Sequence, residues 1–134
     1  MNTIYLYLLI IPVFFAIDMI WLGLAARGFY RNNLGHLLRP DVNWTAAIGF
    51  YLLYIAGIMI FAIMPALEDN SLRRAVLLGG LFGFFAYATY DLTNLATLKG
   101  WPLNVAVVDI IWGIVLTASV AAAGFFIGRW LMIS

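Results

Sequence analysis

The chain has 134 residues, of which 66% are hydrophobic and only 10% are charged, and its formal net charge is +1. A soluble domain is about 45–50% apolar and about 25% charged, so the surface of this protein must face lipid. This composition excludes a nucleic-acid-binding protein and an enzyme with a large α/β core. Because the chain has no Cys, it also excludes a secreted disulfide scaffold.

Four apolar stretches are long enough to cross a bilayer, which takes about 20 residues of helix. We predict spans at residues 3–26, 44–64, 75–98 and 102–127. The first stretch is interrupted by Asp18 and preceded by no Lys or Arg, so we interpret it as a retained span rather than a signal peptide. The expected fold class is all-α: one domain over residues 1–134, an integral membrane bundle of four antiparallel transmembrane helices.

The connection between the first two spans, residues 27–43, has a helical pattern of its own. One half of a helical wheel is apolar and holds Phe29, Tyr30, Leu34, Leu37 and Leu38, and the other is polar and holds Arg31, Asn32, His36 and Arg39. This division is typical of a short helix in the membrane interface, and a plain loop with scattered leucines is the alternative. His36 is the only histidine, so no His-based metal site is expected.

Charge and small residues give weaker information about orientation and packing. Four Lys or Arg in the first and third connections face three on the opposite side, which leans toward both termini lying outside the cytoplasm. The pairs Gly79/Gly83 and Gly124/Gly128 have the spacing that lets helix backbones approach closely. These pairs predict tight helix packing and leave a homo-oligomer open.

Three of the six acidic residues lie inside predicted spans, with no basic residue in any span to pair with them: Asp18, Asp91 and Asp109. A charged side chain at that depth costs at least about 2.5–3.5 kcal/mol. Counted along the helices from the nearest connection, the three acids lie about 13, 12 and 10 Å deep from the same membrane face. We therefore expect three helices to present carboxyls in one slab of the membrane.

The neighbours of these acids suggest a shared polar site. Tyr87, Asp91 and Asn94 form one helical stripe, and Asp18-x-x-Trp21 matches Asp109-x-x-Trp112 on a helix that runs in the opposite direction. That match hints at an inverted repeat of the transporter kind. The expected ligand-binding set is Asp18, Asp91, Asp109, Asn94, Tyr87, Trp21 and Trp112.

Two interpretations of the acids compete. In one, protonated carboxyls hydrogen-bond across helices and only hold the bundle together. In the other, they line a polar cavity that binds a cation, exchanges protons or holds a lipid-like molecule, as intramembrane ionisable residues commonly do. In either case we expect at least one aspartate to carry a proton at neutral pH, because desolvation and mutual repulsion disfavour three carboxylates.

The leading functional hypothesis is therefore a protein that binds or transports a cation, a proton or a lipid-like ligand. A structural or accessory subunit of a larger membrane complex is the alternative, and an intramembrane lipid-modifying enzyme comes third. No catalytic residue, resident metal or cofactor is predicted, and an enzyme is not the favoured class. The expected partners are the lipid bilayer and a small ligand.

The segment from Tyr90 to Pro102, YDLTNLATLKGWP, followed by Asp109-Ile-Ile-Trp112, resembles the signature of a bacterial family of unknown function. Its members are short, four-span inner-membrane proteins, so the resemblance implies a multi-pass protein of the bacterial inner membrane but assigns no activity. The chain is also similar in size and span number to the small multidrug exporters. It departs from their pattern, because they use a single acid in the first span.

Overall fold

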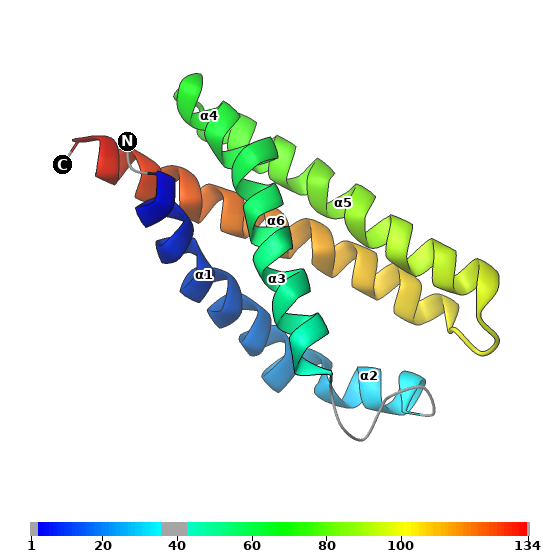
Figure 1. Ribbon diagram of the computed structural model, residues 1–134. Helices are drawn as coiled ribbons and strands as arrows, with labels where there is room; N and C mark the ends of the chain where they lie inside the picture. Colours follow the sequence, from blue (N-terminus) through cyan, green and yellow to red (C-terminus); the bar gives the residue numbers. More distant parts are fainter. Residues whose placement is uncertain (1–2, 36–42, 134) are drawn as a thin grey trace.

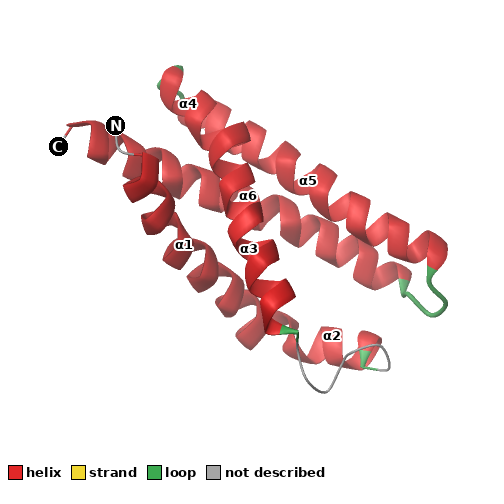
Figure 2. Ribbon diagram, in the orientation of Figure 1, coloured by secondary structure: helices red, strands yellow, loops and turns green. Residues whose placement is uncertain are grey.

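The computed structural model describes residues 3–35 and 43–133, and every regular element in these ranges is helical (Figures 1 and 2). In chain order the elements are α1 (Thr3–Ile20), the π-helix η1 (Trp21–Ala26), α2 (Arg27–Leu34), α3 (Trp44–Ile58), the π-helix η2 (Met59–Ile63), α4 (Met64–Glu68), α5 (Leu72–Thr97) and α6 (Leu103–Ile133). The all-α prediction is confirmed.

Four stretches of helix are long and apolar enough to cross a membrane. They are Thr3–Gly23, Trp44–Glu68, Leu72–Thr97 and Leu103–Met132. Figure 1 shows them running alternately up and down, with the start of α1 and the end of α6 at the same end of the bundle. The predicted antiparallel four-helix membrane bundle is therefore confirmed.

Three helices extend beyond the predicted spans. The last of them, α6, continues past Arg129 to Ile133, although we expected this span to end at residue 127. Local chemistry explains the other two. Ser71 caps α5, because its hydroxyl accepts a hydrogen bond from the backbone N–H of Arg74 at 3.1 Å, so the helix begins before the two arginines. The second span continues past Pro65 to Glu68, where we expected it to end. The wider turns of η2 come directly before this proline, which lets it sit in a continuous helix.

Small residues bring α5 and α6 together as a close hairpin. A methyl group added to Gly79 would come within 2.6 Å of the Ala121 side chain, and one added to Gly83 would overlap the carbonyl oxygen of Gly113. The second glycine pair also faces inward, because Gly124 contacts Ile63 and Gly128 contacts Leu67. Both glycine pairs thus pack inside the bundle, as their spacing predicts.

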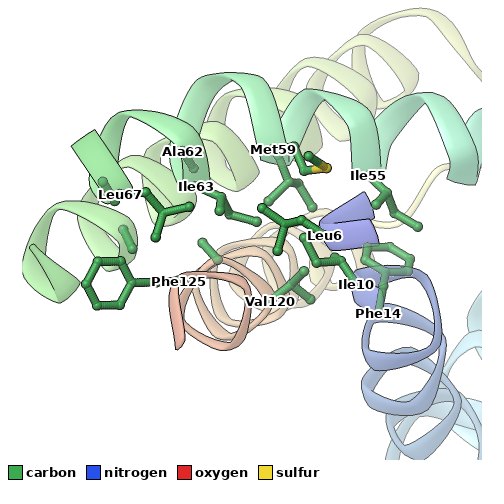
Figure 3. Close-up of a cluster of buried hydrophobic side chains, with 14 of the residues drawn as sticks. Leu6, Ile10, Phe14, Ile55, Met59, Ala62, Ile63, Leu67, Val120 and Phe125 are labelled. Atoms are coloured by element: carbon green, nitrogen blue, oxygen red, sulfur yellow. The ribbon is translucent and has the colours of Figure 1, made fainter. Parts of the chain in front are cut away.

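The apolar core occupies the half of the bundle nearest the two chain ends. Figure 3 shows its side chains meeting from α1, from α3 and η2, and from α6, among them Leu6, Ile10, Phe14, Ile55, Met59, Ile63, Val120 and Phe125. The surface carries many exposed Leu, Ile and Phe side chains, as expected of helices that contact lipid. The three membrane aspartates lie toward the other end of the bundle, nearer α2: Asp18 on α1, Asp91 on α5 and Asp109 on α6.

α2 turns away from the line of α1 after η1 and lies across that other end of the bundle (Figure 1). Leu34 is buried while Arg31 and Asn32 are exposed, so the described part of this segment has the predicted amphipathic character. Asn104 at the start of α6 donates a hydrogen bond to Asn33 at 3.1 Å. The second half of the predicted amphipathic pattern, from His36 to Arg39, lies outside the described residues.

Candidate functional site

Asp18, near the end of α1, is buried and accepts two long hydrogen bonds. The indole Nε1 of Trp112 in α6 donates to its Oδ1 at 3.4 Å, and the hydroxyl of Tyr51 in α3 donates to its Oδ2 at 3.4 Å. Since the three residues come from three helices, the Asp18 carboxyl joins α1, α3 and α6 at one point.

Asp109, in α6, is half-buried and accepts a hydrogen bond from the Tyr30 hydroxyl at 2.8 Å. This bond connects α2 to a helix 79 residues further along the chain. Burial, and then the nearby Asp109 carboxyl, raise the pKa of Tyr30 above its ordinary value. The hydroxyl therefore keeps its proton and remains a donor to Asp109.

Asp91, in α5, is fully buried, with no exposed surface. Neither of its carboxyl oxygens has hydrogen-bond geometry with any group in the described part of the chain. The Asp109 carboxyl of α6 is near enough to interact with it, so a proton on one of these two carboxyls could be shared with the other. A buried carboxylate without a partner is strongly unfavourable, so Asp91 must hold a proton or be neutralised by a group outside the described residues.

The three aspartates form one electrostatic cluster. Asp109 interacts with Asp18 as well as with Asp91. Lys99, in the turn after α5, follows Asp91 by eight residues, about 12 Å along the chain, whereas the basic residues within α5 and α6 lie much further away. On α5, Arg74 lies 17 residues before Asp91, about 26 Å along the helix, and on α6 Arg129 lies 20 residues after Asp109, about 30 Å away. Among the described residues the one ion pair joins Arg74 to Asp69 at 2.8 Å, in the turn before α5.

A cavity of about 410 Å³ lies beside this cluster, between α3, α5 and α6. It is lined by Phe50, Tyr54, Ala86, Tyr87, Tyr90 and Asp109. In Figure 1, α5 and the continuous helix of α3, η2 and α4 meet at one turn and diverge from it, so α3 and α5 are furthest apart at the end of the bundle where α2 lies. Phe50 and Tyr90 are 53% and 56% exposed, so the cavity reaches the outer surface of the bundle between these two helices.

The inner wall of the cavity is held in place by side-chain packing. The Tyr54 hydroxyl shares a hydrogen bond of 2.8 Å with Thr117 of α6, and both residues are buried. The ring of Tyr87 lies directly against Gly113, where any larger residue would collide with it. Rings fixed in this way give the cavity a defined shape.

The structure brings six of the seven sequence-predicted site residues near one another. Asp109 and Tyr87 line the cavity, and Asp91 interacts with Asp109. Asp18 bonds to Trp112, whose indole stacks on that of Trp21 with ring centroids 4.6 Å apart. Asn94 is half-buried beside Tyr90, and no hydrogen bond from it to Asp91 is among those described. Its place in the wall of the site remains a prediction.

Sequence reasoning missed the aromatic residues that complete the site: Tyr30, Phe50, Tyr51, Tyr54 and Tyr90. A signal was present for those on α3, because Phe50 and Tyr54 are four residues apart and fall on one helix face. Tyr30 was assigned only to the apolar half of the interfacial helix. Among the described residues no three Asp, Glu or His side chains lie close enough to share a metal ion. The three carboxyls of this arrangement have the chemistry to exchange a proton or to bind a cation.

Comparison with known proteins shows that the chain belongs to a family. The model of the family described as "Predicted membrane protein (DUF2177)" matches residues 3–126. No curated protein matches the chain, and no solved structure matches it either.

Proposed function

Since the chain belongs to this DUF2177 family of predicted membrane proteins, we propose that it binds a small ligand within the bilayer, or carries it across, in exchange for a carboxyl proton. The exchange site is the cluster of Asp18, Asp91 and Asp109, with Asp109 facing the ligand. Following the resemblance to four-span inner-membrane proteins, we place this activity in the bacterial inner membrane.

The observation that carries this proposal is the state of Asp91. It is fully buried, has no hydrogen-bond partner among the described residues, and adjoins Asp109, which in turn lines a cavity open to the side of the bundle. A carboxyl that only held helices together would be expected to bond to a partner on another helix. A carboxyl with no partner beside an accessible cavity is suited to taking up and releasing a proton.

The packing of the two G-x-x-x-G pairs removes them as docking surfaces for the alternative of an accessory subunit. A subunit that docks on another membrane protein would be expected to present small residues on its outer face. Here the pairs Gly79/Gly83 and Gly124/Gly128 are both covered by other helices of the same chain.

Infrared spectroscopy of the purified full chain in lipid nanodiscs tests the proposal. At neutral pH we expect a protonated-carboxyl stretching band that shifts within minutes of transfer to D₂O and disappears reversibly as the pH is raised. Asp91→Asn and Asp109→Asn should each weaken the band. Asp69→Asn, which changes an exposed carboxyl paired with Arg74, is the matched control and should leave it unchanged.

Two results would contradict the proposal in different ways. A band that neither shifts in D₂O nor responds to pH would mean that the carboxyls are sealed and serve only to hold the helices together. The complete lack of a band would mean that all three acids are ionised, and the exchange site would then be wrongly assigned.

A further inference from the structure

The cavity between α3, α5 and α6 has features that define a ligand class. It holds about 410 Å³, within the range of about 300–1,000 Å³ typical of sites for small organic molecules. A water molecule occupies about 30 Å³ of liquid, so a single inorganic ion would leave most of this space filled by water against apolar walls. Its size therefore favours an organic ligand over an ion such as sodium or magnesium.

The lining of the cavity indicates the charge of that ligand. Four of its six lining residues are aromatic, and the one carboxyl among them belongs to Asp109. Faces of aromatic rings attract cations, and a carboxylate attracts them further. Among the described residues the lining contains no Lys, Arg or His that would recognise an anionic group, and the carboxyls of Asp18 and Asp91 lie nearby. The charge pattern fits a cation and repels an anion.

The position of the cavity indicates the route by which the ligand arrives. Phe50 and Tyr90 are both exposed and both lie within helices long enough to cross the membrane. The opening between them therefore faces lipid. A ligand that enters here must first dissolve in the bilayer, so its cationic centre must carry apolar substituents.

The hydrogen bond from Tyr30 prepares Asp109 for such a ligand. It engages Oδ1 at 2.8 Å and fixes the direction of the carboxyl, while Oδ2 is outside this bond. A carboxyl oriented in advance loses little freedom when a cation binds, which favours affinity.

We infer that the cavity formed by Phe50, Tyr54, Tyr87, Tyr90, Ala86 and Asp109 binds a lipophilic organic cation, such as a quaternary ammonium or phosphonium ion with apolar substituents. This inference rests on the proposed function and names its ligand class. Asp109 supplies the countercharge, and the aromatic rings surround the cationic centre and its substituents.

The test uses two probes of nearly the same shape and opposite charge, tetraphenylphosphonium and tetraphenylborate. Binding to the full chain in nanodiscs of neutral phosphatidylcholine is measured by calorimetry, and the signal from empty nanodiscs is subtracted to remove simple partitioning. We expect saturable binding of the phosphonium at one site per chain and no saturable binding of the borate. Both ions dissolve in lipid, so a difference between them reports the charge preference of the protein.

Three variants locate the binding site. Asp109→Asn should weaken phosphonium binding by about tenfold or more, because it removes a unit charge from a partly desolvated wall. Tyr90→Leu should weaken it by about threefold to tenfold through the loss of one aromatic face. Phe85→Leu is the matched control, because it removes an exposed ring of the same helix that is not part of the cavity lining, and it should leave the affinity unchanged.

The outcomes separate this inference from the proposed function. If the borate binds as well as the phosphonium, or if neither binds saturably, the organic-cation inference is overturned. It is also overturned if Phe85→Leu weakens binding as much as Tyr90→Leu does. In each of these cases an infrared band that still titrates would leave the proton-exchange site standing, whereas a missing or unresponsive band would overturn the proposed function itself.

Discussion

Trp21 and Trp112 stack face to face, with ring centroids 4.6 Å apart and planes inclined by 10°. Each is the tryptophan of an Asp-x-x-Trp segment, one at the end of α1 and the other in α6. The two similar segments therefore meet in the bundle, as an internal repeat would. Their hydrogen bonds differ, because Trp112 donates to Asp18 whereas Asp109 receives its bond from Tyr30.

Trp112→Phe tests the importance of this contact. The change removes the donor to Asp18 as well as the stacked indole, so we expect the free energy of unfolding in detergent to fall by about 1–3 kcal/mol. The circular dichroism signal of two coupled indoles should disappear with it. Trp44→Phe, at an exposed position, is the control and should change neither quantity. A stable Trp112→Phe protein with an unchanged spectrum would show that the stack contributes little.

Gly83→Ala and Gly80→Ala compare two neighbouring glycines of α5. A methyl group at Gly83 would collide with the backbone of Gly113 and with Thr117, whereas at Gly80 it would lie 3.7 Å from Ile114, an ordinary contact. We expect Gly83→Ala to destabilise the bundle by about 1–3 kcal/mol. Gly80→Ala should be neutral or slightly stabilising, since alanine favours helix by up to about 1 kcal/mol. Equal effects in detergent unfolding would mean that α5 and α6 are less closely packed than the structure indicates.

Tyr30→Phe should loosen α2 from the bundle, because it removes the hydrogen bond to Asp109. A hydrogen bond of this kind contributes about 1 kcal/mol, so amide hydrogen exchange across α2 should accelerate by about fivefold. Asn104→Ala removes the other described hydrogen bond between α2 and α6, and its effect should add to that of Tyr30→Phe. Tyr7→Phe removes a tyrosine hydroxyl that donates to Leu52 instead, and serves as the control. If exchange in α2 is unchanged in both α2–α6 variants, the helix is held by its apolar contacts alone.

The raised pKa of Tyr30 gives a prediction at alkaline pH. An ordinary tyrosine is half-ionised at pH 10. Because burial and Asp109 favour the protonated hydroxyl, the stabilisation from this contact is complete below pH 10 and is lost only as the pH rises through the higher value in the folded protein. Tyrosinate absorbance at pH 10 should therefore be the same in Tyr30→Phe as in the unchanged chain. A lower absorbance in the variant would show that Tyr30 ionises like an exposed tyrosine.

Hydropathy was sufficient to predict the fold, because a bilayer leaves few alternatives to helices of about 20 apolar residues. It was also sufficient to single out Asp18, Asp91 and Asp109, since a charged side chain in an apolar run is conspicuous whatever the structure around it. The ends of the helices depended on local chemistry, such as the cap at Ser71.

The partners of the acids could not be predicted in the same way. A helix that is apolar on all sides does not reveal which face points inward, so nothing in the sequence directed Tyr51 toward Asp18. The contact of Tyr30 with Asp109 depends on the direction that the chain takes after η1, and this direction is set by tertiary packing. The cavity likewise follows from the angle between α3 and α5, which no residue pattern specifies.

The bonds that connect distant parts of this chain also bear on how it is made. Asp18 belongs to a helix that leaves the ribosome well before α6, the helix of Trp112, which donates to it. Tyr30 likewise cannot form its hydrogen bond until Asp109, 79 residues later in the chain, has been synthesised. During synthesis the Asp18 carboxyl therefore lacks its Trp112 donor until α6 has been made. The polar site is completed only when α6 has joined the three earlier helices, so its formation depends on the membrane insertion of α6.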